Sequence, residues 1–167
     1  MLQVRLEYVS TGDTIDFIVC HHPSKYGGAD QSQERRLAAM NALVELCDSL
    51  SNTNKVIMGD FNDLPTADQF KAVSEFLINK SEVLHESGEG TIRFKGKWEL
   101  IDMFLVNSSI DSFSKMEILK IPFLMTYDRS YPGYKPLRTY SGPKYLGGVS
   151  DHCPIILKIL LPLRDFR

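Results

Sequence analysis

A short apolar run that ends in oxygen-bearing side chains constrains this chain more than any other stretch. Residues 56–58 are Val-Ile-Met, and their uninterrupted apolar character predicts a buried strand. The run stops at Gly59, where the backbone can turn without the steric cost of a Cβ. Asp60 and Asn62 follow at i and i+2, a spacing that points both side chains to one side of an extended chain. The pair predicts a site for a hard cation or a phosphate-bound water, although Gly, Asp and Asn are also the usual residues of a tight turn.

The bulk properties indicate an ordinary globular domain. A length of 167 residues allows one domain with a real core, and 43% hydrophobic with 24% charged residues is typical of this class. The net charge of −2 gives no overall basic field, yet a groove on a neutral protein can be locally basic. Three cysteines in separate apolar runs argue against a disulfide framework and a structural zinc site. No transmembrane segment is expected, since no run reaches about 18 apolar residues.

The chain alternates between strand and helix patterns in its first half and is mostly strand and loop in its second. Leu2 to Tyr8 alternates apolar and polar residues, which predicts a half-buried strand. Thr66 with Gln69 three residues on forms a capping box, which predicts a helix over about 66–79. The other expected elements are strands over 14–20, 56–60, 91–94, 98–106, 117–121 and 154–161, and a helix over about 32–50. This order indicates an α/β protein.

A second group of polar residues lies inside or beside apolar strands. Asp102 interrupts the apolar run 100–106, where a charge is costly unless it has a partner. Backbone amides could satisfy it, or His152, which follows Asp151 at the mouth of the last apolar strand. A hydrogen bond between Asp102 and His152 would hold the imidazole in one tautomer and make it a better base.

Four separate strands therefore end in, or contain, residues able to carry chemistry. His21 ends the second strand, and taken alone it is more often a hydrogen-bonded loop residue. Sites in α/β proteins nevertheless collect at strand ends, because rigid strands there hold side chains in place. The full set is His21, Asp60 with Asn62, Asp102, and Asp151 with His152.

Four motifs around these residues resemble consecutive motifs of the endonuclease/exonuclease/phosphatase superfamily, which has the DNase I-like fold. They are residues 19–24 (VCHHPS), 58–62 (MGDFN), 100–104 (LIDMF) and 150–155 (SDHCPI). Residues 21–28, 96–99 and 144–148 are similar to a bacterial branch of that superfamily. The resemblance covers essentially the whole chain. It implies an α/β (α+β) protein with a four-layer α/β/β/α sandwich, in which residues 1–167 form a single, incomplete domain.

The resemblance also shows what is missing. Family members begin with a strand bearing an Asn and another bearing a Glu that is the principal metal ligand, and neither motif occurs before His21. The chain therefore resembles the carboxyl-terminal portion of such a protein, and roughly a hundred residues would normally precede Leu2. Any export signal would lie upstream of Met1, so the compartment is not predicted. An incomplete sandwich would expose apolar sheet, through which a homo-oligomer could form.

By this resemblance the chain implies hydrolysis of a phosphate ester, on nucleic acid or another phosphoester, assisted by Mg²⁺ or Mn²⁺. Asp151 would help to hold the metal, and His152, held by Asp102, would contact the phosphate and help to activate water. Asp60 would orient that water, and phosphate would be bound by Asn62, His21 and Arg138. Without the family's glutamate, we expect metal affinity to fall and this chain to be weak or inactive. The alternatives are a phosphatase or lipid-headgroup phosphodiesterase of the same fold, and an inactive phosphate-binding or assembly module.

Two basic segments have a functional and an ordinary interpretation. Residues 126–148 interleave cations with five tyrosines, which could bind phosphate backbones and stack bases. An ordered covering loop whose tyrosines pack on the sheet is the commoner arrangement for such a segment. Arg35 and Arg36 could also meet phosphates, but the solvated face of the first helix is the more usual place for them.

Overall fold

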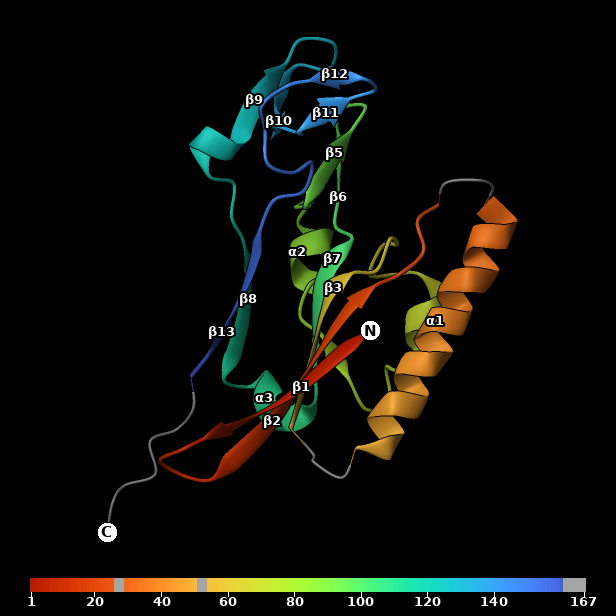
Figure 1. The fold of residues 1–167 in the computed structure, drawn as a ribbon, viewed down its shortest axis with the longest axis vertical. Coiled ribbons are helices and arrows are strands. Elements are labelled where there is room, and N and C mark those ends of the chain that lie inside the picture. Colours follow the sequence, from red (N-terminus) through yellow and green to blue (C-terminus); the bar gives the residue numbers. More distant parts are fainter. Residues whose placement is uncertain (26–28, 51–53, 161–167) are drawn as a thin grey trace.

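A five-stranded mixed sheet organises the molecule (Figure 1). The computed structural model describes the backbone of residues 1–25, 29–50 and 54–160, and the side chains of 29–31 lie outside the described set. The strand order is β1-β2-β3-β7-β4, and only β2 and β3 are parallel to each other. The strands are β1 Leu2–Tyr8, β2 Asp13–His21, β3 Lys55–Asp60, β4 Ile78–Asn79 and β7 Asp102–Val106.

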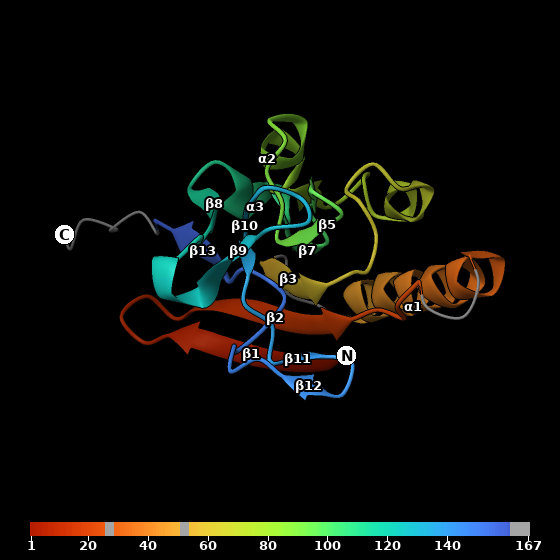
Figure 2. The same ribbon diagram turned by 90° about the horizontal axis from the view of Figure 1, so that it is seen from above.

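Helix α1 (Ala29–Ser49) connects the two parallel strands and lies beside the sheet (Figures 1 and 2). A parallel pair needs such a crossover, because its strands run in the same direction. The side chains of Met40, Leu43 and Cys47 are buried in the core, whereas Leu37 is 46% exposed. Ile18 and Ile57 meet them from the sheet and are fully buried. One part of the core therefore lies between α1 and β2–β3, and the same cluster continues through Met103 and Leu105 of β7 to Met116 of the segment that follows.

The remaining elements form short hairpins and turns around this sheet. β8 and β13 form a separate antiparallel pair, and three hairpins, β5–β6, β9–β10 and β11–β12, gather at one end of the molecule (Figure 1). The bounds are η1 Asp68–Ala72, α2 Glu82–Glu86, β5 Ile92–Phe94, β6 Lys97–Glu99, α3 Ser108–Asp111, β8 Ser114–Ile118, η2 Pro122–Leu124, β9 Met125–Asp128, β10 Gly133–Pro136, β11 Tyr140–Ser141, β12 Lys144–Tyr145 and β13 Ile155–Ile159. Within the part of the chain that the structure describes, no helix has the length and apolarity needed to cross a membrane.

The prediction of a helix over 66–79 is wrong. The segment holds only the five-residue 3₁₀ helix η1, and Ala67, not Thr66, precedes it without a side-chain cap. A helix cannot extend to residue 79, because Ile78 and Asn79 pair with Val106 and Leu105 as the edge strand β4. Sheet pairing and the burial of Phe70 and Val73 override the local capping signal.

The structure also corrects two expectations for the second half of the chain. The strand expected over 98–106 is divided into β6 and β7, with Leu100 and Ile101 buried between them. Residues 126–148 form two hairpins whose tyrosines are 43–65% exposed instead of packing on the sheet. Within each hairpin two tyrosine rings meet edge to face, with centroids 5.6 and 5.4 Å apart.

Candidate active site

The sheet register brings three predicted residues to one end of adjacent strands. His21 of β2 is the partner of Asp60 across the parallel pair, and Asp60 is the partner of Asp102 across the antiparallel pair. His21 Nε2 lies 3.7 Å from Asp60 Oδ2, and the His21 side chain is 78% exposed. The prediction that these strand ends place their polar side chains together therefore agrees with the geometry.

Gly59 allows β3 to approach β2 closely just before Asp60. Its φ of +142° is rarely adopted by other residues, and a Cβ built there would lie 1.9 Å from the carbonyl oxygen of Cys20. No side chain fits this position. The glycine thus sets the position of Asp60, which is the last residue of β3.

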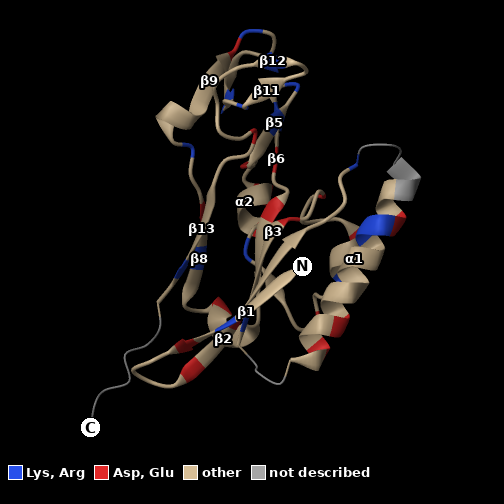
Figure 3. Ribbon diagram, viewed as in Figure 1, with Lys and Arg blue, Asp and Glu red and all other residues tan. Residues whose placement is uncertain are grey.

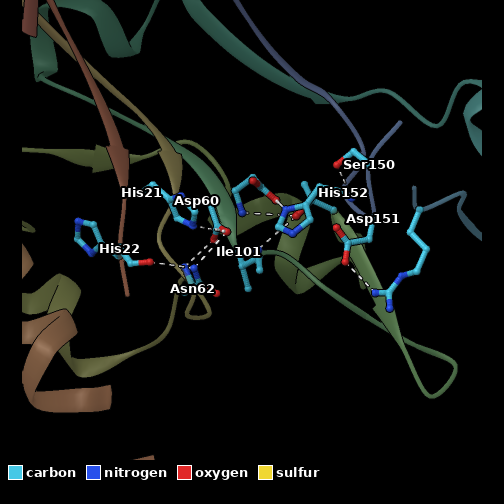
Figure 4. Close-up of polar contacts among 11 residues, drawn as sticks. His21, His22, Asp60, Asn62, Ile101, Ser150, Asp151 and His152 are labelled. Carbon is cyan, nitrogen blue, oxygen red and sulfur yellow. Dashed lines mark hydrogen bonds and ion pairs between the residues drawn. The ribbon is translucent and has the colours of Figure 1, made fainter. Parts of the chain in front are cut away.

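Asn62 fixes the carboxylate of Asp60. Its φ of +51° is left-handed, a conformation that Asn tolerates better than most residues. The backbone N–H of Asn62 donates to Asp60 Oδ1 at 2.7 Å, and its Nδ2 donates to Asp60 Oδ2 at 3.1 Å and to the carbonyl of His22 at 2.9 Å (Figure 4). Both oxygens of Asp60 are therefore held, and the turn after β3 is tied to the end of β2.

Asp102 and His152 form the hydrogen-bonded pair expected from the sequence. His152 Nδ1 lies 2.8 Å from Asp102 Oδ2, although the two residues are 50 positions apart (Figure 4). Thr91 supports both: its hydroxyl is 3.4 Å from the N–H of Asp102, and its carbonyl accepts from the N–H of Cys153 at 2.7 Å. Thr91 is fully buried. Sequence reasoning missed this role, because a lone Thr beside a short strand carries no such signal.

The surroundings shift the protonation of two of these groups. Burial lowers the pKa of His152, but its hydrogen bond with Asp102 and the negative charges of Asp102, Asp60 and Asp151 outweigh burial, so the pKa is raised. Burial raises the pKa of Asp60; the N–H of Asn62 opposes this and the charge of Asp102 adds to it, and the net shift is upward. The carboxylates of Asp60 and Asp102 repel each other in this partly buried place, so a bound cation would stabilise them.

The donor set of the site suits such a cation. Asp60, Asp102 and His152 each offer one ligand atom, and these atoms lie within 4.8 Å of one another. Carboxylate oxygens are the ligands that Mg²⁺ and Mn²⁺ prefer, and two of the three groups are carboxylates. The residues present therefore fit a divalent metal at this strand edge.

Asp151 points to a different partner. Its Oδ2 accepts a hydrogen bond from Arg138 Nη2 at 2.7 Å, with both side chains about half exposed (Figure 4). It is not one of the three residues whose ligand atoms converge. The neighbouring Ser150 accepts from the N–H of His152 at 3.0 Å and holds the loop that presents the imidazole.

Arg36 is not on the solvated face of α1, contrary to the expectation from its sequence. It is 4% exposed, and its Nε donates to Asp63 Oδ2 at 3.2 Å. Asp63 also pairs with Lys25 at 2.9 Å. These contacts attach α1 to the turn that carries Asn62, so Arg36 supports the site from behind. A helical repeat alone does not reveal this, because Asp63 belongs to a distant loop.

A profile of the endonuclease/exonuclease/phosphatase family matches residues 2–160. The chain belongs to this family. None of the curated proteins compared with it by sequence matches. The structure is similar to a mannosyl-6-phosphatase from Bacteroides thetaiotaomicron (17% identity, TM-score 0.56, 94% of this chain and 55% of that one). It is also similar to an AP endonuclease from Archaeoglobus fulgidus (14% identity, TM-score 0.64, 95% of this chain and 65% of that one). A third similar structure is a 3′ phosphatase from Neisseria bound to a DNA hairpin product (12% identity, TM-score 0.53, 95% of this chain and 65% of that one).

These similarities confirm the family and the DNase I-like fold class expected from the four motifs. The family takes its name from endonucleases, exonucleases and phosphatases, and these three neighbours are named as two phosphatases and an AP endonuclease. The chain spans only about 55% of the mannosyl-6-phosphatase and 65% of the AP endonuclease.

Proposed function

We propose that this chain carries the base and the phosphate contacts of a divalent-metal-dependent phosphoester hydrolase. The observation that supports this most directly is the convergence of Asp60, Asp102 and His152 within 4.8 Å, with His152 Nδ1 bonded to Asp102. The substrate is a nucleic acid or another phosphate ester, in keeping with neighbours named as an AP endonuclease, a 3′ phosphatase and a mannosyl-6-phosphatase.

His152 acts on the attacking water. Its Nδ1 donates to Asp102, so Nε2 is left free to accept a proton. Water attacks phosphorus, the new P–O bond forms, and the bond to the alcohol oxygen breaks. The water proton passes to Nε2 of His152, and the departing alkoxide takes a proton from solvent on the opposite side of phosphorus. Asp102 holds the ring orientation and stabilises the imidazolium that forms.

Asp60 and His21 act on the same centre as His152. Asp60, held at both oxygens by Asn62, orients the water. His21, largely exposed, contacts a phosphate oxygen. Both amide hydrogens of Asn62 are already used on Asp60 and His22, so its part is to position Asp60, and direct phosphate binding would cost one of these bonds.

Asp60 and Asp102 would hold the divalent cation, and Asp151 would join them by leaving Arg138. That exchange is cheap, because a half-exposed ion pair contributes only about 0–1 kcal/mol. Arg138 would then be free to meet a phosphate oxygen. When bound, Mg²⁺ or Mn²⁺ would stabilise the negative charge that builds on the phosphoryl oxygens.

The test is hydrolysis of bis(4-nitrophenyl) phosphate with Mg²⁺ or Mn²⁺, by wild type and by His152→Ala. Because the family's glutamate is absent, we expect only weak turnover, which EDTA abolishes and which His152→Ala reduces by about 10²–10⁴-fold. His85→Ala on α2 is the matched control and should retain the wild-type rate. Turnover that survives His152→Ala would contradict the assignment.

The chain offers a second candidate function, since it spans little more than half of the first neighbours. It would then bind phosphate, or assemble with a partner, without catalysis. Phosphate binding in the absence of any metal-dependent turnover would favour this alternative over the hydrolase.

A further inference from the structure

A cavity of about 380 Å³ opens beside the candidate active site, between β5 and the β9–β10 hairpin. Its lining includes His152 and Asp151, so it is continuous with the place where the scissile phosphate would lie. Its volume falls in the range of small-molecule sites. A group attached to that phosphate would therefore extend into this cavity.

The charges that line the cavity do not balance. They are Arg93, Lys95, Lys135, Arg138, Asp128 and Asp151. Both acids are already paired, Asp128 with Lys135 and Asp151 with Arg138, each at 2.7 Å. Arg93 and Lys95 have no carboxylate within 4 Å among the residues that the structure describes. Figure 3 shows basic segments at the end of the molecule that holds β5 and the hairpins.

Arg93 is a fixed part of the cavity wall. Its Nη1 donates to the carbonyl of Tyr131 at 2.9 Å, and its Nη2 donates to the carbonyl of Pro132 at 3.1 Å. Gly133 makes room for it, since a Cβ there would lie 2.8 Å from Nη2. Arg93 thus fastens the β5–β6 hairpin to the β9–β10 turn while its charge stays without a carboxylate.

Lys95 is the free cation of the cavity, and its backbone position is unusual. It occupies the two-residue β5–β6 turn with Gly96, at a φ of +46°. Such turns strongly favour Asn, Asp or Gly at this place, and a lysine there is strained. Strained residues collect at functional sites. Its Nζ lies 5.3 Å from the centre of the exposed Phe94 ring and is otherwise open to a ligand.

We propose that this cavity binds a second anionic group of the substrate, with the ammonium of Lys95 contacting it. The inference rests on the proposed phosphoesterase site and narrows its substrates to phosphoesters that carry a further phosphate on the alcohol side. A bisphosphorylated small molecule and a nucleic-acid strand share this chemistry. A phosphomonoester of a neutral alcohol lacks it.

The experiment compares matched ligands on the full chain at low ionic strength, with EDTA present so that nothing is hydrolysed. The ligands are a series of alkanediol bisphosphates, the corresponding monophosphates, and tetrathymidylate, with binding measured by calorimetry. We expect a bisphosphate to bind wild type about fivefold more tightly than its monophosphate, as one added exposed ion pair allows. Lys95→Gln should lose this preference and Lys95→Arg should keep it.

Lys97→Gln on β6 is the control, since it removes the same charge two residues away and does not line the cavity. Tighter binding of tetrathymidylate than of every bisphosphate would identify a nucleic-acid strand as the source of the second phosphate, and the reverse order a small molecule. Equal affinity for mono- and bisphosphates, or an equal loss in Lys97→Gln, would overturn the proposal. If a bisphosphate binds in a way that depends on Lys95 but no metal-dependent turnover is found, the proposed hydrolase is wrong and the second anion site is still supported.

Discussion

Gly59 is the residue on which the position of Asp60 depends most directly. A Cβ at this position would meet the backbone of Cys20 at 1.9 Å and would also require a φ of +142°. Backbone atoms cannot move aside as a flexible side chain can. We therefore expect Gly59→Ala to separate β2 from β3 and to cost about 3 kcal/mol or more of the free energy of unfolding.

Gly88→Ala provides the matched control for this prediction. Gly88 also has a positive φ, +80°, but nothing lies within 4 Å of its added Cβ. Gly88→Ala should lower the free energy of unfolding only by the strain of the positive φ, about 1 kcal/mol. Urea midpoints at an unchanged m-value measure both variants. An equal decrease in the free energy of unfolding for both variants would show that the close approach to Cys20 does not contribute to stability.

Residues on buried strands could be predicted from the sequence, and residues that depend on distant loops could not. Asp60, Asp102 and His152 could be predicted because each lies within or beside an apolar run, where a charged side chain is costly unless it has a partner. Thr91 and Arg36 were missed, since their partners Cys153 and Asp63 lie 62 and 27 positions away. Neither distance leaves a trace in local periodicity.

Secondary structure elements, like single residues, could be predicted where a local pattern determines them and not where a distant contact does. The sequence predicts β1, β2, β3 and β7 of the sheet from alternating or continuous apolar runs, although β1, expected to be half buried, is exposed along its full length. The helix over 66–79 failed because its capping residues compete with the pairing of Ile78 to Val106, which is a tertiary contact. The sequence does not predict the β9–β10 and β11–β12 hairpins, because their strands are only two to four residues long.

The β1–β2 hairpin depends on one buried carboxylate. Asp16 of β2 is fully buried and accepts hydrogen bonds from Arg5 at 2.9 and 2.8 Å and from Gln3 at 2.9 Å, both on β1. The hydrogen bond with Arg5 lowers the pKa of Asp16, burial opposes it, and the bond with Gln3 adds to the decrease. Because the folded pKa lies below the unfolded value near 3.8, the stabilisation is complete above that value.

We accordingly expect β1 to loosen as the pH falls through the lowered pKa of Asp16. Hydrogen exchange of the β1 amides, referenced to those of β3, should accelerate over this acidic range. Asp16→Asn should show the fast exchange already at neutral pH, while Glu7→Gln, also on β1, removes a charge opposite Thr14 and should behave as wild type. A β1 that stays protected in Asp16→Asn would mean that its backbone ladder, not the ion pair, holds it.

At the scale of the whole molecule, β1 is the edge of the sheet and is exposed along its full length. Leu2, Val4, Leu6 and Tyr8 are 41–62% exposed. An apolar cavity of about 410 Å³ adjoins them, and its lining includes Leu6, Tyr8, Phe17 and Phe113. An unpaired edge with an apolar face is a template for another chain. The structure thus supplies the exposed sheet on which a homo-oligomer was predicted from the sequence.

A second copy of this chain, pairing edge to edge through β1, is the occupant we expect. Sedimentation velocity over a concentration series should show reversible dimerisation, since edge pairing adds a backbone ladder and buries the apolar side chains of both copies. Leu6→Lys places a charge within that face and should shift the equilibrium to monomer by tenfold or more, about 1.4 kcal/mol. Val83→Lys makes the same change at another exposed apolar residue, on α2, and should leave the dimer intact. A monomer at every concentration, or equal weakening by Val83→Lys, would show that the β1 edge does not mediate association and that its apolar face is covered by something other than a second copy.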